Sequence, residues 1–268
     1  MKTLKLGLYL IHRFLRTATV FDDCVTTWGE AISKSTGYSD SIILEKVTKS
    51  FSASIKSGKL IERDSVVLNL EDAEYSYPLL FALQYSANFN KNKLRVLDYG
   101  GSLGSIYRQY GSFFKNYASI EWSIVEQSHF VKKGRELNFS DNLSFFETLE
   151  DCLVNNKPNL ALFSSSLQYL EDPFEILNQV SESDIQILVL DRIPIYTSHP
   201  HTISVQYVPD WIYGSRVSYP SHIFNLKDMS ALLNKNWKPI SEFKSLGGDS
   251  ITRTGKTVSW GGSVYLRK

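Results

Sequence analysis

The pattern of hydrophobic and polar positions changes near residue 90. After it, short apolar segments alternate with amphipathic ones in the order strand, helix, strand, helix. The segments expected to be strands are "LRVLDYG", "IEWSIVEQ", "LSFFETL", "NLALFSSS" and "IQILVLDRI". Nearly continuous apolar strands that alternate with amphipathic helices are typical of a parallel sheet covered on both faces. We therefore predict a doubly wound, mostly parallel α/β domain, in which the final segments "WKPISEFKSLGG" and "TVSWGGSVYLRK" form an antiparallel pair.

Before residue 90, the spacing of apolar residues is mostly helical. "FDDCVTTWGEAISKSTG" opens with aspartates that can cap a helix, and "SDSIILEKVTKSFSASIKSG" has Ser41 before its apolar periodicity and Gly58 after it. A short extended piece follows, and then a helix from about Tyr77. We therefore divide the chain into a helical N-terminal extension or cap, residues 1–90, and an α/β domain, residues 91–268.

Residues 1–20 have the pattern of a basic amphipathic helix, with leucine and isoleucine on one face and basic side chains off it. The uninterrupted apolar run from Leu8 to Ile11 is too short for a signal peptide or a membrane span. Two interpretations stay open: an ordinary helix packed on its own domain, and peripheral contact with an anionic membrane surface. We expect a cytoplasmic protein, membrane-associated if the second interpretation holds.

Composition excludes several classes of function. The 268 residues carry 29 basic and 28 acidic side chains, a formal net charge of +1, which argues against a general nucleic-acid binder. Cys24 and Cys152 lie far apart in the sequence, as suits a reducing cytoplasm. Because no His, Asp or Glu cluster has the spacing of a metal site, we expect no metal.

A glycine-rich turn follows the first strand of the α/β domain. Asp98, Gly100, Gly101 and Gly104 lie at its carboxyl end, where ligands bind in doubly wound sheets. Adjacent glycines permit positive φ and keep side chains away from a ligand. The order G-G-x-x-G differs from the dinucleotide pattern G-x-G-x-x-G. The aspartate before the glycines suits a ligand with a cationic amino-acid end, and its carboxylate either organises the loop or holds an ammonium group.

Polar side chains also follow the next strands. Glu126 ends "WSIVEQ", one strand–helix–strand step after Asp98. A carboxylate at this position can accept hydrogen bonds from both hydroxyls of a ribose, although a solvated edge residue is the plainer interpretation of an isolated glutamate. The fourth strand runs into the polar loop "SSSLQYLEDP" on the same rim. The turn and Glu126 together therefore predict a nucleoside site.

Taken together, "VLDYGGSLG", "VEQ" and "LFSSSLQYLEDP" resemble the class I S-adenosylmethionine-dependent methyltransferases. More narrowly, they resemble methyltransferases encoded among bacterial surface-polysaccharide genes, and this resemblance extends roughly from Trp28 to the C-terminus. It implies a seven-stranded Rossmann-like methyltransferase sheet, S-adenosylmethionine as the cofactor, and O-methylation of a sugar or glycan precursor. One departure is Ser102, because the wider class usually has glycine there.

The resemblance also implies cofactor contacts residue by residue. Asp98, Gly100 and Gly101 would contact the methionine end, and Glu126 the ribose. Phe146 and Glu147, at the end of the third strand, would neighbour the adenine. The full set of expected cofactor-binding residues is Asp98, Gly100, Gly101, Ser102, Gly104, Glu126, Gln127, Ser165, Ser166 and Leu167.

Catalysis requires groups on the same rim. Methyl transfer is an in-line displacement, so the enzyme mainly aligns the acceptor and removes a hydroxyl proton. The segment of residues 193–225 is long for a connection, and we expect it to shape the acceptor pocket. The candidate catalytic residues are His222, as a general base near neutral pH, with Tyr219 and Asp191. A purely structural role for His222 is the alternative interpretation.

Other residues have two interpretations each. Arg63 and Arg192 either bind an anionic group of the acceptor or form ion pairs with Asp64 or Asp191. Four aromatic residues either line the acceptor side or pack the helical cap; they are Trp28, Tyr38, Tyr75 and Tyr77. The alternative function is a catalytically inactive, methyltransferase-like binding or scaffold protein of the same pathway. A nicotinamide-dependent sugar oxidoreductase is disfavoured by the order of the glycines.

Overall fold

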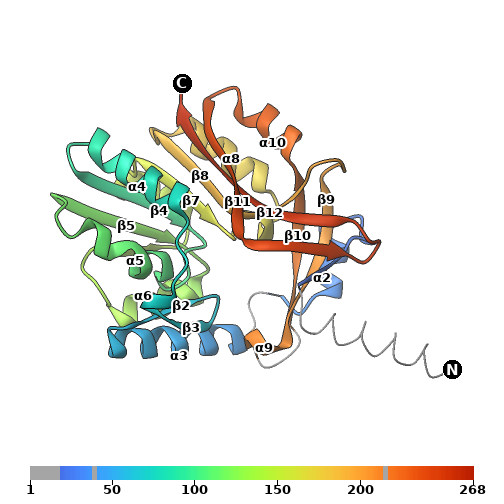
Figure 1. Ribbon diagram of the computed structural model, residues 1–268, viewed down its shortest axis with the longest axis horizontal. Coiled ribbons are helices and arrows are strands. Elements are labelled where there is room, and N and C mark those ends of the chain that lie inside the picture. Colours follow the sequence, from blue (N-terminus) through green and yellow to red (C-terminus); the bar gives the residue numbers. More distant parts are fainter. Residues whose placement is uncertain (1–18, 38–40, 214–216) are drawn as a thin grey trace.

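The computed structural model describes residues 19–37, 41–213 and 217–268. The expected amphipathic helix of residues 1–20 therefore lies almost wholly outside the described residues, as does Tyr38. Within the described ranges, the main sheet has ten strands in the order β10-β9-β1-β11-β12-β8-β7-β4-β5-β6 (Figure 1). They are β1 (Val20–Asp22), β4 (Lys93–Tyr99), β5 (Ser119–Val125), β6 (Leu143–Phe146), β7 (Leu160–Ser164), β8 (Ile187–Tyr196), β9 (Thr202–Val208), β10 (Val217–Asn225), β11 (Trp237–Thr252) and β12 (Thr257–Arg267).

One half of the sheet is doubly wound. Strands β8, β7, β4, β5 and β6 are parallel neighbours, and β4, the first of them in the chain, lies in the middle. The helices of this half and of the segment before β11 are α4 (Tyr77–Phe89), α5 (Ser105–Tyr110), α6 (Ser128–Leu137), α7 (Leu149–Asn156), α8 (Pro173–Glu182) and α10 (Leu226–Leu233). The predicted parallel α/β arrangement is confirmed, and so is the final antiparallel pair, β11 with β12.

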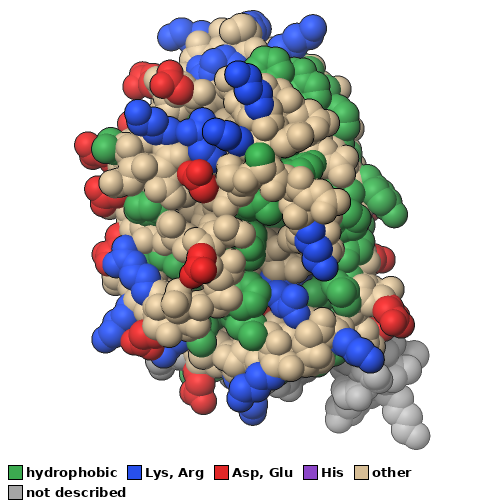
Figure 2. Space-filling model, turned by 90° about the vertical axis from the view of Figure 1, so that its left-hand side faces the viewer, with side chains coloured by type: hydrophobic (Ala, Val, Ile, Leu, Met, Phe, Trp, Pro, Cys, Tyr) green, Lys and Arg blue, Asp and Glu red, His purple; other side chains and the backbone are tan. Residues whose placement is uncertain are grey.

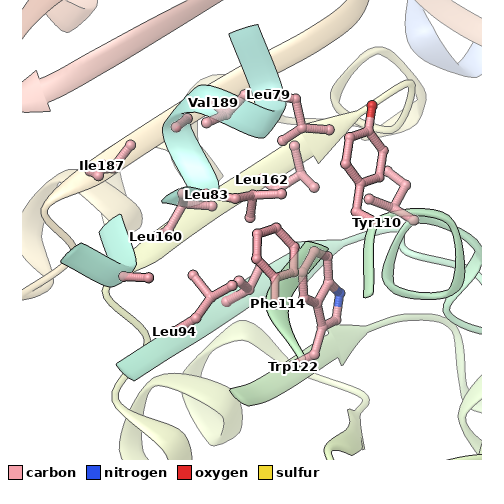
Figure 3. Close-up of a cluster of buried hydrophobic side chains, with 14 of the residues drawn as sticks. Leu79, Leu83, Leu94, Tyr110, Phe114, Trp122, Leu160, Leu162, Ile187 and Val189 are labelled. Carbon is pink, nitrogen blue, oxygen red and sulfur yellow. The ribbon is translucent and has the colours of Figure 1, made fainter. Parts of the chain in front are cut away.

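The parallel strands bury side chains on both faces. On one face, Val96 of β4 and Leu162 of β7 pack with α4 and α5 in a large apolar cluster (Figure 3). On the other face, Leu97 and Phe163, the next residues along the same two strands, pack with α7, α8 and α10. Successive residues of a strand point to opposite faces, so burial on both explains why these strands are almost continuously apolar.

The other half of the sheet closes on itself. Ile195 and Tyr196, at the end of β8, pair in parallel with β10, while β1 lies between β9 and β11. Strands β8, β12, β11, β1, β9 and β10 thus form a barrel-like group. The expected count of seven strands is wrong for this sheet, because β1, β9 and β10 join it. Residues 193–225, expected as a connection, contain β9, the short helix α9 (Asp210–Tyr213) and β10.

The region before residue 90 is helical only in part. It contains α2 (Trp28–Lys34) and α3 (Ser41–Ser57), but also β1 and a hairpin of β2 (Leu60–Arg63) with β3 (Val66–Asn69), followed by the 3-10 turn η1 (Leu70–Asp72). Asp64 and Ser65 form the tip of the hairpin, with φ values of 51° and 68°. Positive φ at both central residues is what a two-residue hairpin turn of type I′ requires. The domain boundary at residue 90 stays a prediction.

The surface carries one apolar feature on α4. Tyr77, Phe81, Tyr85 and Phe89 follow one another at every fourth position, and all four are exposed. Figure 2 shows hydrophobic side chains along the upper right margin of one face, while charged side chains of both signs are interspersed over the rest of that face. Among the described helices, none combines the length and the apolar character that crossing a membrane requires.

Candidate active site

Two adjoining cavities lie at the carboxyl ends of the parallel strands. The larger has a volume of about 280 Å³ and the smaller about 210 Å³. Gly100, Ser165 and Tyr169 line both. Gly100 follows β4 and Ser165 follows β7, and between these two strands the chain reverses the direction in which it builds the sheet. The cavities therefore occupy the position where open α/β sheets bind their ligands.

The glycine turn keeps this position free of side chains. A Cβ atom added to Gly100, which has a φ of +72°, would lie 2.4 Å from Cβ of Ser166. A Cβ atom added to Gly101 would lie 2.6 Å from Cγ of Asp98. Gly104, with a φ of +99°, precedes the first residue of α5. Ser102 also has a positive φ of 55°, the region that glycine adopts without strain. The serine at this position therefore keeps a glycine-like backbone.

Asp98 lies beneath the turn and lines neither cavity. Its side chain is buried and accepts a hydrogen bond of 3.0 Å from Nε1 of Trp122. Burial raises the pKa of its carboxyl to about 7, against the opposing effects of Trp122 and Arg192. Of the two roles expected for Asp98, its contacts support organisation of the loop.

Glu126 directly follows β5 and lines the smaller cavity. Its Oε1 accepts a hydrogen bond of 3.1 Å from the backbone N–H of Ser102, and its Oε2 accepts one of 2.9 Å from the N–H of Gln127. Burial raises the pKa of this carboxyl to about 7, although both N–H groups favour the ionised form. Gln127 and Glu147 line the same cavity. The structure thus brings Glu126 and the glycine turn together, as the sequence predicts.

The loop after β7 meets the same cavities. Ser165 and Ser166 line the smaller one. Ser165 has a φ of 58°, and its N–H donates to the carbonyl oxygen of Asp191 at 2.9 Å. Leu167 is fully buried, begins the 3-10 turn η3 (Leu167–Tyr169), and lines neither cavity. Two of the three expected loop residues therefore face the site.

The three candidate catalytic residues lie in different surroundings. Tyr219 lines the larger cavity. Asp191 lies behind its wall, where it accepts hydrogen bonds from the hydroxyls of Ser164 and Ser245 at 3.1 and 2.9 Å. His222 lines neither cavity.

Both ring nitrogens of His222 are engaged. Its Nδ1 lies 2.8 Å from Nε2 of His201, and its Nε2 lies 3.0 Å from the carbonyl oxygen of Leu170. The ring also stacks on Trp28, with the ring centroids 4.7 Å apart. Burial, and then the neighbouring His201, lower the pKa of His222 to about 4. These contacts support the structural interpretation of His222.

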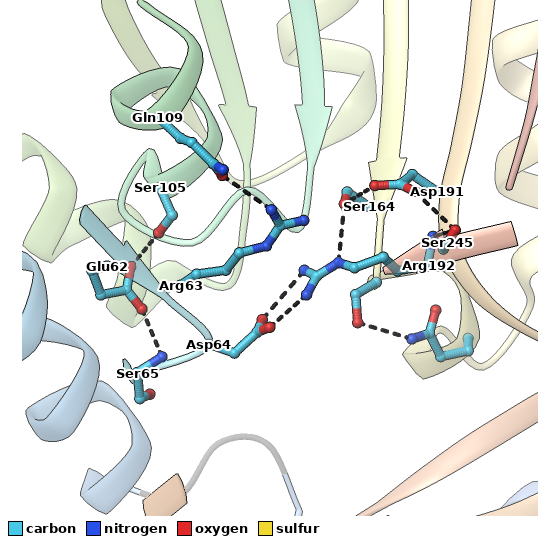
Figure 4. A network of polar contacts seen from close by, with 12 residues as sticks. Glu62, Arg63, Asp64, Ser65, Ser105, Gln109, Ser164, Asp191, Arg192 and Ser245 are labelled. Carbon is cyan, nitrogen blue, oxygen red and sulfur yellow. Dashed lines mark hydrogen bonds and ion pairs between the residues drawn. The ribbon is translucent and has the colours of Figure 1, made fainter. Parts of the chain in front are cut away.

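The hairpin β2–β3 adds a charged group to the wall of the larger cavity. Glu62, Arg63 and Asp64 line the larger cavity, and so does Arg192 from β8 (Figure 4). Nη1 of Arg192 lies 2.5 Å from Oδ2 of Asp64, so this pair joins the hairpin tip to the sheet. Arg192 has a positive φ of 53°, near the point where β8 passes from β7 to β10. For Arg192, the ion-pair interpretation is confirmed, with Asp64 as the partner.

The three described aromatic residues considered for the acceptor side, Trp28, Tyr75 and Tyr77, lie elsewhere. Tyr77 is exposed on α4, and Tyr75 packs edge-on against Tyr110, with ring centroids 5.3 Å apart. With Trp28 stacked on His222, these three contribute nothing to the lining of either cavity. The part of the chain that the structure describes contains no group of three or more His, Cys, Asp or Glu side chains able to hold a metal ion.

Comparisons with known proteins give structural neighbours only. No family model and no curated protein matches the sequence. Solved structures with a similar arrangement include the N-terminal domain of EvdMO1 with SAH bound, at 12% identity over 70% of this chain and 81% of that one, TM-score 0.43. Another is a S-adenosylmethionine-dependent methyltransferase from Clostridium acetobutylicum, at 10% identity over 73% and 93%, TM-score 0.45. A third is SAM-bound CalS10, an amino pentose methyltransferase from Micromonospora echinaspora, at 9% identity over 74% and 94%, TM-score 0.44.

Proposed function

We propose that this protein binds S-adenosylmethionine across the two cavities, with the adenosine in the smaller and the methionine end in the larger. The observation that carries the proposal is Glu126, a carboxylate fixed by two backbone N–H groups at a strand end beside a cavity of about 210 Å³. Such a carboxylate can accept both ribose hydroxyls. Gly100, which lines both cavities, leaves bare backbone where the sulfonium centre would pass between them.

The residues that line the larger cavity suit an acceptor with a polar ring. When bound, S-adenosylmethionine supplies a methyl group activated for in-line transfer. The residues of this chain would hold the acceptor in line and exclude water. Tyr169, Gln206, Tyr213, Tyr219 and Trp260 line the larger cavity and combine aromatic faces with hydroxyl and amide groups. Such groups suit a sugar, and we propose O-methylation of a sugar or glycan precursor, in bacterial surface polysaccharide synthesis as the resemblance implies.

His222 would take no part in proton transfer, because both of its ring nitrogens are engaged outside the cavity. Tyr219 is the candidate that lines the cavity and would contact the acceptor. Asp191 would act through Ser164 and Ser245, whose hydroxyls donate hydrogen bonds to its carboxylate.

A catalytically inactive binding protein of the same pathway is the second candidate function. It is favoured by the position of His222, because the histidine expected as a base is held by His201, Leu170 and Trp28 and lines neither cavity. Such a protein would bind the cofactor without methyl transfer.

Calorimetry with S-adenosylhomocysteine tests the cofactor site. Mass spectrometry of candidate sugar nucleotides after incubation with S-adenosylmethionine then tests turnover. Binding with a gain of one methyl group on a sugar supports the enzyme. Binding without turnover of any candidate supports the inactive protein, and no binding contradicts both.

A further inference from the structure

Among the described residues, four charged side chains line the larger cavity, and only two of them form an ion pair with each other. The charged residues that line it are Glu62, Arg63, Asp64 and Arg192. Asp64 and Arg192 pair with each other. Figure 4 shows Glu62 and Arg63 on one side, Arg192 on the other, and Asp64 between them. The two charged groups not used by that pair are therefore neighbours in the chain and opposite in sign.

Arg63 has unused hydrogen-bonding capacity. Its Nη1 donates to Oε1 of Gln109 at 3.0 Å, whereas its Nη2 is buried and has no hydrogen-bond partner among the described residues. A buried N–H donor without a partner is costly, and a guanidinium donates best to a carboxylate or phosphate. Burial, and then the nearby Arg192, lower the pKa of Arg63, so an anion at this position would relieve an unfavourable environment.

Glu62 offers the complementary group. It is 2% exposed and accepts hydrogen bonds from the hydroxyl of Ser105 and from the backbone N–H of Ser65, the latter at 2.7 Å. Each carboxylate oxygen has a second lone pair, so both bonds are compatible with a further donor. Burial raises the pKa of Glu62 to about 7, against the effects of Ser105 and Ser65. A cationic ligand group would restore the ionised form.

The amino-acid end of the proposed cofactor carries the two matching charges, an ammonium and a carboxylate. Asp98, the other acidic candidate for the ammonium, is buried beneath Gly101 and lines neither cavity. Ser105 and Gln109, the partners of Glu62 and Arg63, lie on α5, which directly follows the glycine turn. We propose that Glu62 and Arg63 form a clamp for this amino-acid end, Glu62 receiving the ammonium and Arg63 the carboxylate. This inference rests on the proposed function.

The clamp is tested with two probes that differ only at the amino-acid end. S-adenosylhomocysteine carries it, whereas 5′-methylthioadenosine has the same adenosine and a thioether without it. By calorimetry, Arg63→Met and Glu62→Gln should each weaken S-adenosylhomocysteine binding about 10- to 100-fold. The affinity of each variant for 5′-methylthioadenosine should stay within about twofold of the wild-type value. Arg63→Lys keeps the charge, so its affinity for S-adenosylhomocysteine should lie between those of the wild type and of Arg63→Met. Arg253→Met, at an exposed arginine that lines neither cavity, is the matched control.

The possible results separate the clamp from the proposed function. If folded Arg63 and Glu62 variants bind S-adenosylhomocysteine as the wild type does, the clamp is wrong and the cofactor site stands. Equal loss of both probes also overturns the clamp, since the effect would then not concern the amino-acid end. If the wild-type protein binds neither probe, the proposed function itself fails. Circular dichroism and thermal unfolding of each variant establish that it is folded.

Discussion

Replacing Gly101 with alanine should destabilise the protein through a single close contact. The added Cβ would lie 2.6 Å from both Cγ and Oδ2 of Asp98, a distance that no ordinary packing tolerates. The neighbour cannot move easily, because Asp98 is 1% exposed and its carboxylate is held by the indole of Trp122. Gly101 does not have a positive φ, so the cost comes from packing rather than from backbone strain.

The magnitude follows from the cost of overpacking a buried site. One methyl group in a well-packed core typically costs about 1–3 kcal/mol. For a chain of this size that corresponds to a fall of roughly 2–10 °C in the unfolding midpoint. Urea unfolding gives the free energy directly. Binding of S-adenosylhomocysteine should weaken as well, because relief of the contact moves the turn that lines the larger cavity.

Gly111→Ala provides the matched control. Gly111 has helical dihedral angles, and apart from its chain neighbours and the backbone of its own helix, no described atom lies within 4 Å of the position its Cβ would take. This change should be neutral or stabilising by a few tenths to about 1 kcal/mol. If Asp98 is the obstacle, the cost of Gly101→Ala should largely disappear in an Asp98→Ala background. Equal stability of Gly101→Ala and Gly111→Ala would refute the reasoning.

Three further predictions concern the site and one concerns the N-terminus. Glu126→Gln should weaken S-adenosylhomocysteine binding by about 1–3 kcal/mol in calorimetry; unchanged affinity in a folded variant would remove Glu126 from the site. Burial raises the pKa values of Glu62, Asp98 and Glu126 to about 7, so the native state holds protons that the unfolded chain has lost above about pH 4.5. The unfolding free energy of the ligand-free protein should therefore fall as pH rises from about 5 to about 7, and thermal unfolding that is flat or rising over this range would contradict it. His222→Ala should keep S-adenosylhomocysteine affinity within about twofold while lowering the thermal midpoint, since its ring packs on Trp28 and faces no cavity; a parallel loss of affinity would count against this. If the N-terminal segment contacts membranes, the full chain should sediment with anionic liposomes and deletion of residues 1–18 should abolish this. If the full chain does not sediment, the result favours a helix packed on its own domain.

The parallel half of the fold could be predicted because its signals are local. The central strands β4 and β7 are buried on both faces and therefore almost continuously apolar, and the glycines mark the turn where β4 ends. Once a doubly wound sheet is expected, Glu126 and the glycine turn must meet at one edge, as they do. These features depend on residues a few positions apart and on one general rule of topology.

The barrel-like group and the charged hairpin depend on pairings that no local pattern shows. β1 has only three residues, too few for any periodicity. The tip of the β2–β3 hairpin is Asp64–Ser65 rather than the Asn-Gly or Asp-Gly that usually marks such a turn. Without a recognised turn, the positions of Glu62 and Arg63 in the cavity wall could not be derived. For His222, the sequence left a general base and a structural residue open as interpretations, because its partners, His201 and Leu170, lie 21 and 52 positions away in the chain.

The placement of β1 between β9 and β11 has a consequence for how the chain folds during synthesis. Strands β4 to β8 have all left the ribosome soon after residue 196 is made, and their connections are short-range crossovers. Val20 and Phe21, in contrast, pair with Ile251 and Thr252, which are made more than two hundred residues later. Contacts of such high sequence separation form slowly, because the chain must lose the entropy of closing a long loop before the contacts can stabilise it. Strand β1 is therefore translated before the parallel strands but is among the last to pair, and until it does, the edges of β9 and β11 that face it lack their hydrogen-bonding partner.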